Sequence, residues 1–235
     1  MKYLFFLLFS GVLLAQNNLV IYTANQFQNK EFKNKITSDL KNTLDQAKQK
    51  VLDLKIELIF NDSVSVFKLS DTYKASTLEE KLATVKAGIS SKRYINFKKN
   101  KSFYNNNGNP IFGENEFLIY DNLDFDWKIL NEEKKIDNFK VIKATGTANK
   151  SERKVTVIAW FAPEIPFRHG PYGVGNLPGL ILEMQIGDVH YTAKEIVLNK
   201  SAKEIDFPNK GKLIHVQDYY LLQKERLEEL KKSFK

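Results

Sequence analysis

The chemically richest run of this sequence lies between Pro163 and Gly179. It places one cation, Arg168, one titratable ring, His169, and one aromatic hydroxyl, Tyr172, close together in the chain. A guanidinium forms paired hydrogen bonds with anionic groups, and a tyrosine offers both an apolar ring and a polar tip. These three side chains therefore predict the rim of a site for an anionic or amphipathic ligand or partner, with all three pointing outward.

The same run is suited to hold one backbone shape. Four of the six prolines and four of the eleven glycines of the chain fall within it. Proline fixes φ and glycine permits positive φ, so we expect a rigid loop, and rigid loops on a sheet often carry binding sites. The residues expected to hold its shape are Pro163, Pro166, Gly170, Pro171, Leu177, Pro178, Gly179, Leu180 and Ile181. A crossover between two strands needs such residues without any ligand, and that alternative stays open.

Residues beside and within this run widen the candidate site. Trp160 and Phe161 precede it, and Asn176 lies inside it. Ligand sites are concave and mostly apolar, with a few fixed polar groups. We therefore add these three residues to the binding candidates. For Trp160, and likewise for Trp127, packing in the core is at least as good an explanation.

Metal and catalytic patterns are weak in this chain. His169, His190 and His215 stand 21 and 25 residues apart, so none forms the close pair that usually holds a metal on a strand or helix. The chain has no cysteine, which excludes thiolate catalysis and cysteine-based metal sites. Glu164 and Glu183 are carboxylates of a kind more often solvated than catalytic. We expect no metal, no cofactor and no catalytic residue, although a scattered catalytic triad leaves no trace in one sequence.

Three helical segments are predicted around this region. Apolar residues recur at steps of three and four from Phe32 to Leu54, which predicts one long amphipathic helix. Ser76 to Ala87 is the second segment, because a Ser or Thr cap is followed by two glutamates in its first turn. Val216 to Phe234 returns to helical spacing and ends near two lysines, which suit the negative end of the helix dipole.

Short strands make up most of the remaining chain. Lys55 to Leu69 predicts a strand pair around the turn-like Asn61-Asp62-Ser63, whereas Leu19 to Tyr22 is only a short apolar stretch. Ile186 to Val189 has the pattern of a tight hairpin, and Asn105 to Pro110 that of an exposed loop. Seven further strands are predicted at 94–97, 116–120, 127–130, 139–147, 154–161, 180–186 and 189–198.

These elements predict an α+β fold class. We expect a single curved antiparallel sheet or incomplete β-barrel, with the long N-terminal helix and the C-terminal helix packed on it. No repeat and no linker rich in Pro, Gly or Ser divides the chain. Residues 16–235 are therefore expected to form a single mainly antiparallel β domain with helices.

Residues 1–15 have the pattern of a secretory signal peptide. Lys2 supplies a positive charge, and Tyr3 to Ala15 contains no charged residue. This apolar run is shorter than the ~20 residues that a spanning helix needs. We expect an exported protein, periplasmic or secreted, with no transmembrane helix in the mature chain. It should carry no lipid anchor, because a bacterial lipoprotein is acylated on a cysteine.

The net charge of +8 does not by itself indicate a nucleic-acid partner. Lysines dominate and are spread along the chain, whereas arginine occurs only at Arg93, Arg153, Arg168 and Arg226. Nucleic-acid sites favour arginine for paired and stacked contacts. We expect no nucleic-acid partner, and a surface that suits a membrane surface or polysaccharide.

The segment from Tyr172 to Leu182 resembles the GLPGLI family of Gram-negative envelope proteins, which is named for this motif. The motif itself corresponds to Leu177-Pro178-Gly179-Leu180-Ile181, with Asn176 in place of its first glycine. Asparagine tolerates the left-handed region better than other non-glycine residues, so we expect the backbone turn to survive. The other stretches that match the family are Ala159-Trp160-Phe161, Glu164-Ile165-Pro166, Gly170-Pro171, Trp127 and Lys143-Ala144.

The resemblance implies an envelope location and an architecture but no chemistry, because the function of the family is unknown. More loosely, the order of elements looks like that of LolA-like lipoprotein carriers, in which an incomplete barrel wraps an apolar cavity. This is a likeness of fold, and fold alone does not determine function.

Two functions follow as expectations. The first is a noncatalytic envelope protein that binds or carries an apolar or amphipathic ligand, or assists an outer-membrane protein such as a receptor. The alternative is a periplasmic hydrolase of peptides or cell-wall polymers, with Arg168, His169 and Glu164 as candidates. An apolar cavity would favour the first function, and a buried carboxylate beside His169 would favour the second.

Overall fold

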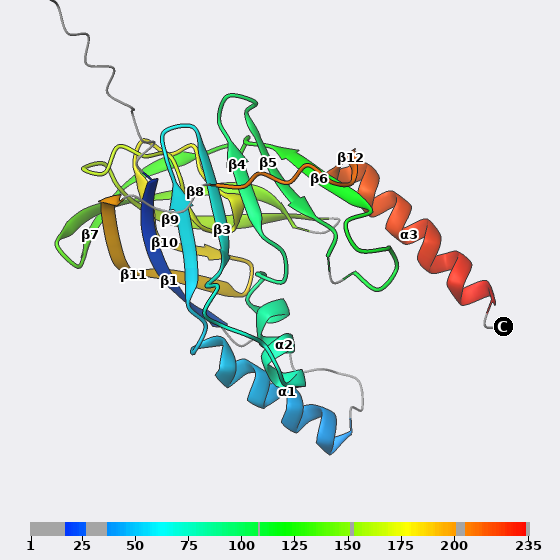
Figure 1. The fold of residues 1–235 in the computed structure, drawn as a ribbon. Helices are drawn as coiled ribbons and strands as arrows, with labels where there is room; N and C mark the ends of the chain where they lie inside the picture. Colours follow the sequence, from blue (N-terminus) through cyan, green and yellow to red (C-terminus); the bar gives the residue numbers. More distant parts are fainter. Residues whose placement is uncertain (1–16, 27–36, 108, 151–152, 201–204, 234–235) are drawn as a thin grey trace, which may run out of the picture.

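The computed structural model describes residues 17–26, 37–107, 109–150, 153–200 and 205–233. Within these residues the chain forms one large, open, 12-stranded sheet and three α-helices (Figure 1). The strand order is β12-β6-β5-β4-β3-β2-β1-β11-β10-β9-β8-β7. The sheet therefore has two arms that meet at β1: a first arm of β2 to β6 with β12, and a second arm of β7 to β11.

The first arm begins with two hairpin strands that the sequence predicts. Asn61 closes their turn, because its Oδ1 accepts hydrogen bonds from the Ser63 and Val64 amides at 3.0 and 3.1 Å. The first-arm strands are β2 (Ile56–Phe60), β3 (Val64–Leu69), β4 (Arg93–Asn96), β5 (Lys101–Asn105), β6 (Phe117–Asn122) and β12 (Lys212–His215). Of these, β5 and β12 were not predicted, because neither shows a clear alternation of apolar and polar residues.

The second arm is antiparallel throughout its described strands. Its last hairpin closes as predicted, with Ile186 opposite Val189 and Gly187 at a φ of 60°. The second-arm strands are β7 (Lys128–Ile136), β8 (Phe139–Lys150), β9 (Arg153–Ala162), β10 (Leu180–Ile186) and β11 (Val189–Lys200).

The central strand is β1 (Asn17–Gln26), which pairs antiparallel with β2 on one side and β11 on the other. Val20, Tyr22 and Ala24 alternate along it and are buried, as expected of a strand that lays one face on the core. The sequence pattern predicts only the short stretch from Leu19 to Tyr22, because asparagines dilute the apolar signal on both sides.

The sheet is mixed, so the expectation of a continuous antiparallel sheet is wrong at one edge. There β12 pairs with β6 in parallel, with Lys212 opposite Phe117 and His215 opposite Tyr120. The segment just before β12 lies on the first arm, where the Phe207 ring is 5.0 Å from that of Tyr94. The chain thus reaches the far edge of the sheet and adds a strand there in the same direction as β6.

The first helix is shorter than predicted. α1 (Ser38–Val51) has 14 residues, and its N-cap is Thr37, whose side chain accepts a hydrogen bond from the Leu40 amide. Phe32 and Ile36, on which the expectation of a long helix also relied, lie outside the described residues. The helix begins after Thr37 because this cap residue has an extended backbone. α1 packs mainly against α2, at one end of the sheet (Figure 1).

The other two helices agree with the sequence pattern. α2 (Leu78–Lys86) begins with a capping box, in which the Thr77 hydroxyl accepts from the Glu80 amide and the Glu80 carboxylate accepts from the Thr77 amide. α3 (Val216–Ser233) packs its first turn, through Val216 and Tyr219, on a cluster at the edge of the sheet, and then projects away from it (Figure 1). Among the described residues, no helix is long and apolar enough to cross a membrane.

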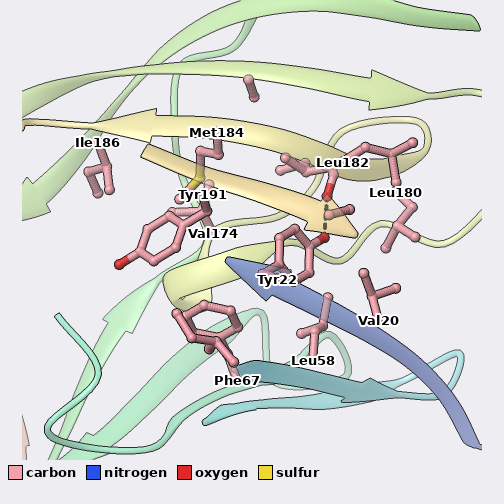
Figure 2. Packing of buried hydrophobic residues seen from close by; sticks show 14 of the residues in the cluster. Val20, Tyr22, Leu58, Phe67, Val174, Leu180, Leu182, Met184, Ile186 and Tyr191 are labelled. Carbon is pink, nitrogen blue, oxygen red and sulfur yellow. Dashed lines mark hydrogen bonds between the residues drawn. The ribbon is translucent and has the colours of Figure 1, made fainter. Parts of the chain in front are cut away.

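The main core lies between the two arms. A single cluster of buried residues joins β2 and β3 of the first arm to β8, β9, β10 and β11 of the second. Figure 2 shows part of it, with Tyr22, Phe67 and Tyr191 gathered against Val174. The edge-to-face contacts of Phe67 with Tyr22 and Tyr191 have centroid distances of 6.0 and 5.4 Å, which is favourable geometry for aromatic pairs.

Candidate functional site

The run from 163 to 179 connects β9 to β10 and is itself part of the core. We call residues 163–179 the plug. Ile165, Val174 and Leu177 are at most 2% exposed, and all three belong to the cluster between the arms. The loop expected to lie at a rim is therefore partly interior, whereas Arg168 and Asn176 remain exposed.

Hydrogen bonds hold the plug to itself and to both arms. Inside it, the Asn176 amide donates to the Arg168 carbonyl at 2.8 Å. Trp127 Nε1 donates to the Gly175 carbonyl at 2.9 Å, and the Asn176 side chain donates to the Leu123 carbonyl. Asn176 has a φ of 71°, so the left-handed turn expected at this position of the motif is present.

Two glycines of the plug are required by close backbone approach. A Cβ on Gly179 would lie 2.3 Å from the Ala162 carbonyl oxygen, and one on Gly175 would lie 2.5 Å from the Arg168 carbonyl oxygen. Neither distance is compatible with a side chain. At Gly179 the close approach is to the end of β9.

His169 does not point outward. Its side chain is fully buried, with ring centroids 5.2 Å from Phe60 and 4.7 Å from Phe97, and its Nε2 lies 2.7 Å from the Asn61 carbonyl oxygen. Burial is the main cause that lowers the pKa of His169 to about 4. Within the described part of the chain no carboxylate contacts His169, so the feature that would favour a hydrolase is not found there. The outward orientation was wrong because the plug is threaded between the arms.

Arg168 and the two aromatic candidates before the plug lie in three different places. Arg168 is exposed and stacks its guanidinium 4.5 Å from the centre of the Phe97 ring. Phe161 is buried in the core between the arms. Trp160, its neighbour on β9, points to the opposite face of the sheet, where Lys134 Nζ lies 4.3 Å from its ring centre. These residues do not converge on one site.

The outer face of the second arm holds a satisfied ion cluster around Glu183. Both oxygens of Glu183 lie 2.7 Å from Lys134 Nζ, and His190 Nε2 lies 3.1 Å from Oε1. The hydrogen bond from His190, followed by that from Lys134, lowers the pKa of Glu183. A carboxylate held ionised in this way is a poor general acid, and Glu164 is exposed in the plug.

The remaining candidate, Tyr172, does take part in an unusual arrangement. Its hydroxyl accepts a hydrogen bond from Arg93 Nη2 at 3.2 Å. The Arg93 guanidinium lies 3.7 Å from the ring centre of Tyr104 and 4.4 Å from that of Tyr172. Such cation–π contacts stabilise a cation away from water. The plug thus places the Tyr172 side chain against the Arg93 guanidinium, at the start of β4.

This cation lies in a small cleft at one end of the space between the arms. Residues of β4, β5, β6, β8, β10, α3 and the plug line it, and its volume is about 40 Å³. The two arms are joined beside it, where Asn149 Nδ2 of β8 donates to Asp121 Oδ2 of β6 at 2.9 Å. We call this feature the Arg93 cleft.

The charge of Arg93 has no opposite partner among the described residues. Its guanidinium forms no salt bridge there, and its Nε is buried without a hydrogen-bond partner. Asp121, which also lines the cleft, accepts from Asn149 and from the Asn122 amide. A cation enclosed by tyrosines and lacking a carboxylate is a candidate site for an anion.

Tyrosine hydroxyls complete the polar lining of the Arg93 cleft. The Tyr104 and Tyr220 hydroxyl oxygens are 3.3 Å apart, and both residues line the cleft. Burial raises the pKa of Tyr104 well above its usual value, so its hydroxyl stays protonated and can donate. The cleft therefore offers hydroxyl donors next to the guanidinium.

Sequence reasoning missed Arg93 as a site residue. Arg93 stands one residue before the predicted strand 94–97, and it is 79 residues from Tyr172 in the chain. Nothing local marks the pair. The one available signal was that only four arginines occur in a lysine-rich chain.

Comparisons with known proteins agree with part of the motif resemblance. A family described as a protein of unknown function (Porph_ging) matches residues 146–183. This region runs from the end of β8 through β9 and the plug into β10, and it contains the GLPGLI-like motif. No match was found among curated proteins.

Two solved structures of PNGF-II are similar to this chain in fold. The form in space group P21 is 19% identical with a TM-score of 0.51, and the form in space group C2 is 20% identical with a TM-score of 0.49. Each match covers 90% of this chain but only 34% and 32% of the PNGF-II chains, so this chain spans about a third of their length. The similarity concerns the fold alone, and the likeness to LolA-like carriers stays a prediction.

Proposed function

We propose that this chain is an exported, noncatalytic cell-envelope protein that binds a ligand or partner through an anionic group in the Arg93 cleft. The signal-peptide pattern of residues 1–15 and the GLPGLI resemblance support the location. The observation that carries the binding proposal is the Arg93 guanidinium, enclosed by two tyrosine rings and without a carboxylate partner among the described residues.

The energetics favour an anion at this position. Removing a charge from water is costly unless an opposite charge or hydrogen bonds replace the lost hydration. The tyrosine rings provide part of that compensation, but the buried Nε–H of Arg93 remains without an acceptor. A bound anion would supply both the charge and the acceptor.

The size of the cleft limits what enters it. A volume of about 40 Å³ accommodates a small charged head group. We therefore propose that an amphipathic ligand inserts its anionic end and leaves its apolar part outside. A partner protein of the envelope would insert an acidic group in the same way.

The test is anion-dependent thermal unfolding of the purified protein at constant ionic strength. Replacing chloride by acetate, phosphate or sulfate should raise Tm for at least one of these anions, because a ligand that binds only the folded state stabilises it. Sulfate and phosphate also stabilise proteins without binding a site, so binding is measured as the part of the rise that Arg93→Gln removes. Arg168→Gln, which removes the exposed plug arginine, should retain the full rise. An equal rise of Tm in the wild type and Arg93→Gln would refute the proposal.

Failure of Arg93→Gln to fold would not end the test. Arg93→Lys keeps the positive charge but lacks the flat array of donors, and it should lower the anion-dependent rise of Tm while leaving circular dichroism unchanged.

A further inference from the structure

We infer that the anionic group recognised in the Arg93 cleft is a carboxylate with an apolar carbon next to it. This inference rests on the proposed function and makes its ligand specific. It follows from the size of the cleft, its charges, the unpartnered Nε of Arg93 and the apolar residues in its lining.

The size of the cleft matches a carboxylate. A volume of about 40 Å³ holds roughly three water-sized groups. The carboxylate group alone has three heavy atoms and fits this volume with the rest of its molecule outside it, whereas all five heavy atoms of phosphate or sulfate belong to the charged group.

The charges of the cleft favour a monoanion. Among its described lining residues Arg93 is the only cation and Asp121 the only carboxylate. A carboxylate neutralises Arg93 and adds no further charge. A dianion would place excess negative charge near Asp121 in a partly desolvated space, where repulsion is strong.

The donors of Arg93 are arranged for two oxygens in one plane. The guanidinium carbon lies 3.7 and 4.4 Å from the ring centres of Tyr104 and Tyr172, and Nη2 donates to the Tyr172 hydroxyl. Nε is buried and has no hydrogen-bond partner among the described residues, so it is the donor that a ligand would satisfy. The planar edge of a guanidinium pairs with the two oxygens of a carboxylate in a fork-to-fork geometry.

Part of the lining of the cleft is apolar. Phe125, Val174, Ile186 and Val216 line the cleft together with Arg93. An aliphatic or aromatic carbon attached to the carboxylate would lie against them and lose contact with water. Propionate, butyrate and the C-terminal residue of a peptide all present this chemistry.

The primary test reads the orphan Nε–H directly by ¹⁵N NMR of the arginine side chains. Titration of the purified protein with butyrate should shift the Arg93 Nε–H signal and leave that of Arg168 in place, whereas phosphate and sulfate should leave both in place. Arg93→Lys should weaken butyrate binding about tenfold or more, because a lysine offers no paired donors. If Arg93→Lys does not fold, Tyr172→Phe replaces it, because this variant keeps the ring and removes only the hydroxyl. Tyr172→Phe should still bind butyrate, and its Arg93 side-chain signal should differ from that of the wild type.

The source of the carboxylate is tested in a second titration. A tripeptide ending in valine, with its N-terminus acetylated, is compared with the same peptide amidated at its C-terminus. Binding of the free acid alone assigns the cleft to peptide C-termini, and binding of butyrate without the peptide assigns it to small free acids.

The outcomes separate this inference from the proposed function. Shifts of the Arg93 signal with phosphate or sulfate but not with butyrate would overturn the carboxylate inference and leave an anion site. No shift with any of the anions, or butyrate binding unchanged in Arg93→Lys, would overturn both.

Discussion

His169 acts in this fold as a neutral hydrogen-bond donor. A carbonyl oxygen only accepts hydrogen bonds, so the contact of Nε2 with the Asn61 carbonyl places the proton on Nε2. Nδ1 is then an acceptor, and it is buried without a partner among the described residues. Through this bond the plug is tied to the turn between β2 and β3.

Stability should therefore fall in mild acid. The pKa of His169 is lowered by burial, from 6.5 to about 4. The unfolded chain thus binds a proton first, so this contribution is present above pH 6.5 and is lost as the pH falls toward 4. Between pH 7 and pH 5 the free energy of unfolding should drop by about 2 kcal/mol from this group. Urea unfolding at both values of pH measures it.

His169→Gln should show a smaller drop between the same two values of pH, because glutamine does not titrate. Gly146→Ala, which disturbs β8 and lies outside the plug, retains His169 and should keep the wild-type dependence on pH, so it controls for lower stability in general. Equal pH dependence in His169→Gln and the wild type would mean that the histidine is not buried in its neutral form.

Gly179 should tolerate no side chain at all. A Cβ there would meet backbone atoms of Ala162 at 2.3 and 2.7 Å, and backbone has little freedom to move. Gly179→Ala should cost about 3 kcal/mol, and Gly179→Val more. The matched control is Gly113→Ala, whose Cβ would have its nearest neighbour at 3.7 Å in the Glu116 side chain. Urea unfolding measures the stability of both variants. Similar free energies of unfolding for Gly179→Ala and Gly113→Ala would contradict the close approach at Gly179.

At the scale of the element, the plug behaves as a strand connection that has become part of the core. Its own hydrogen bonds satisfy backbone groups that a buried loop would otherwise leave unpaired. The Leu180 amide donates to the Ile165 carbonyl and the Ile181 amide to the His169 carbonyl, both at 3.0 Å. Tyr22 adds a bond from its hydroxyl to the Ile181 carbonyl (Figure 2).

Amide hydrogen exchange should report this directly. The amides of Asn176, Leu180 and Ile181 donate to carbonyl groups of the plug, and they are expected to exchange as slowly as those in the middle of β10, because opening them requires the arms to separate. The amide of Asn122, near the end of β6, donates to the Asp121 side chain and should exchange faster. Rapid exchange of the three amides that bond to the plug would mean that the plug opens independently of the sheet.

At the scale of the whole molecule, the sheet leaves β7 as a free edge within the described residues, since β7 pairs only with β8 there. Glu133 and Lys135 are exposed on this strand, and Glu133 pairs with Lys140 at 2.7 Å. Charged residues on an edge strand oppose pairing with a second copy. We interpret them as protection against edge-to-edge association.

The double substitution Glu133→Val with Lys135→Val should therefore promote concentration-dependent association, measured by sedimentation velocity. The net charge is unchanged, so the effect should come from the edge itself. Glu229→Val with Lys232→Val makes the same exchange on exposed positions of α3 and should leave the sedimentation coefficient as in the wild type. Equal behaviour of the two variants would refute a protective role for the edge charges.

The sequence by itself determined the features that depend on near neighbours. The turn at Asn61, the capping box of α2, the hairpin at Gly187 and the extent of α3 all follow from side chains within a few residues of the backbone that they shape. The motif around Asn176 and Gly179 likewise marked a segment with unusual backbone needs.

Only the tertiary structure decided which side chains meet. His169 and Asn61 are 108 residues apart, and Arg93 and Tyr172 are 79 apart. The parallel pairing of β12 with β6 and the insertion of the plug between the arms are likewise contacts between distant segments. The alternation of apolar and polar residues shows which side chains of a strand share one face. It does not show which other segment packs on that face. The physical reason is that burial and charge pairing depend on the packing of the whole sheet, and one sequence carries no local record of that packing.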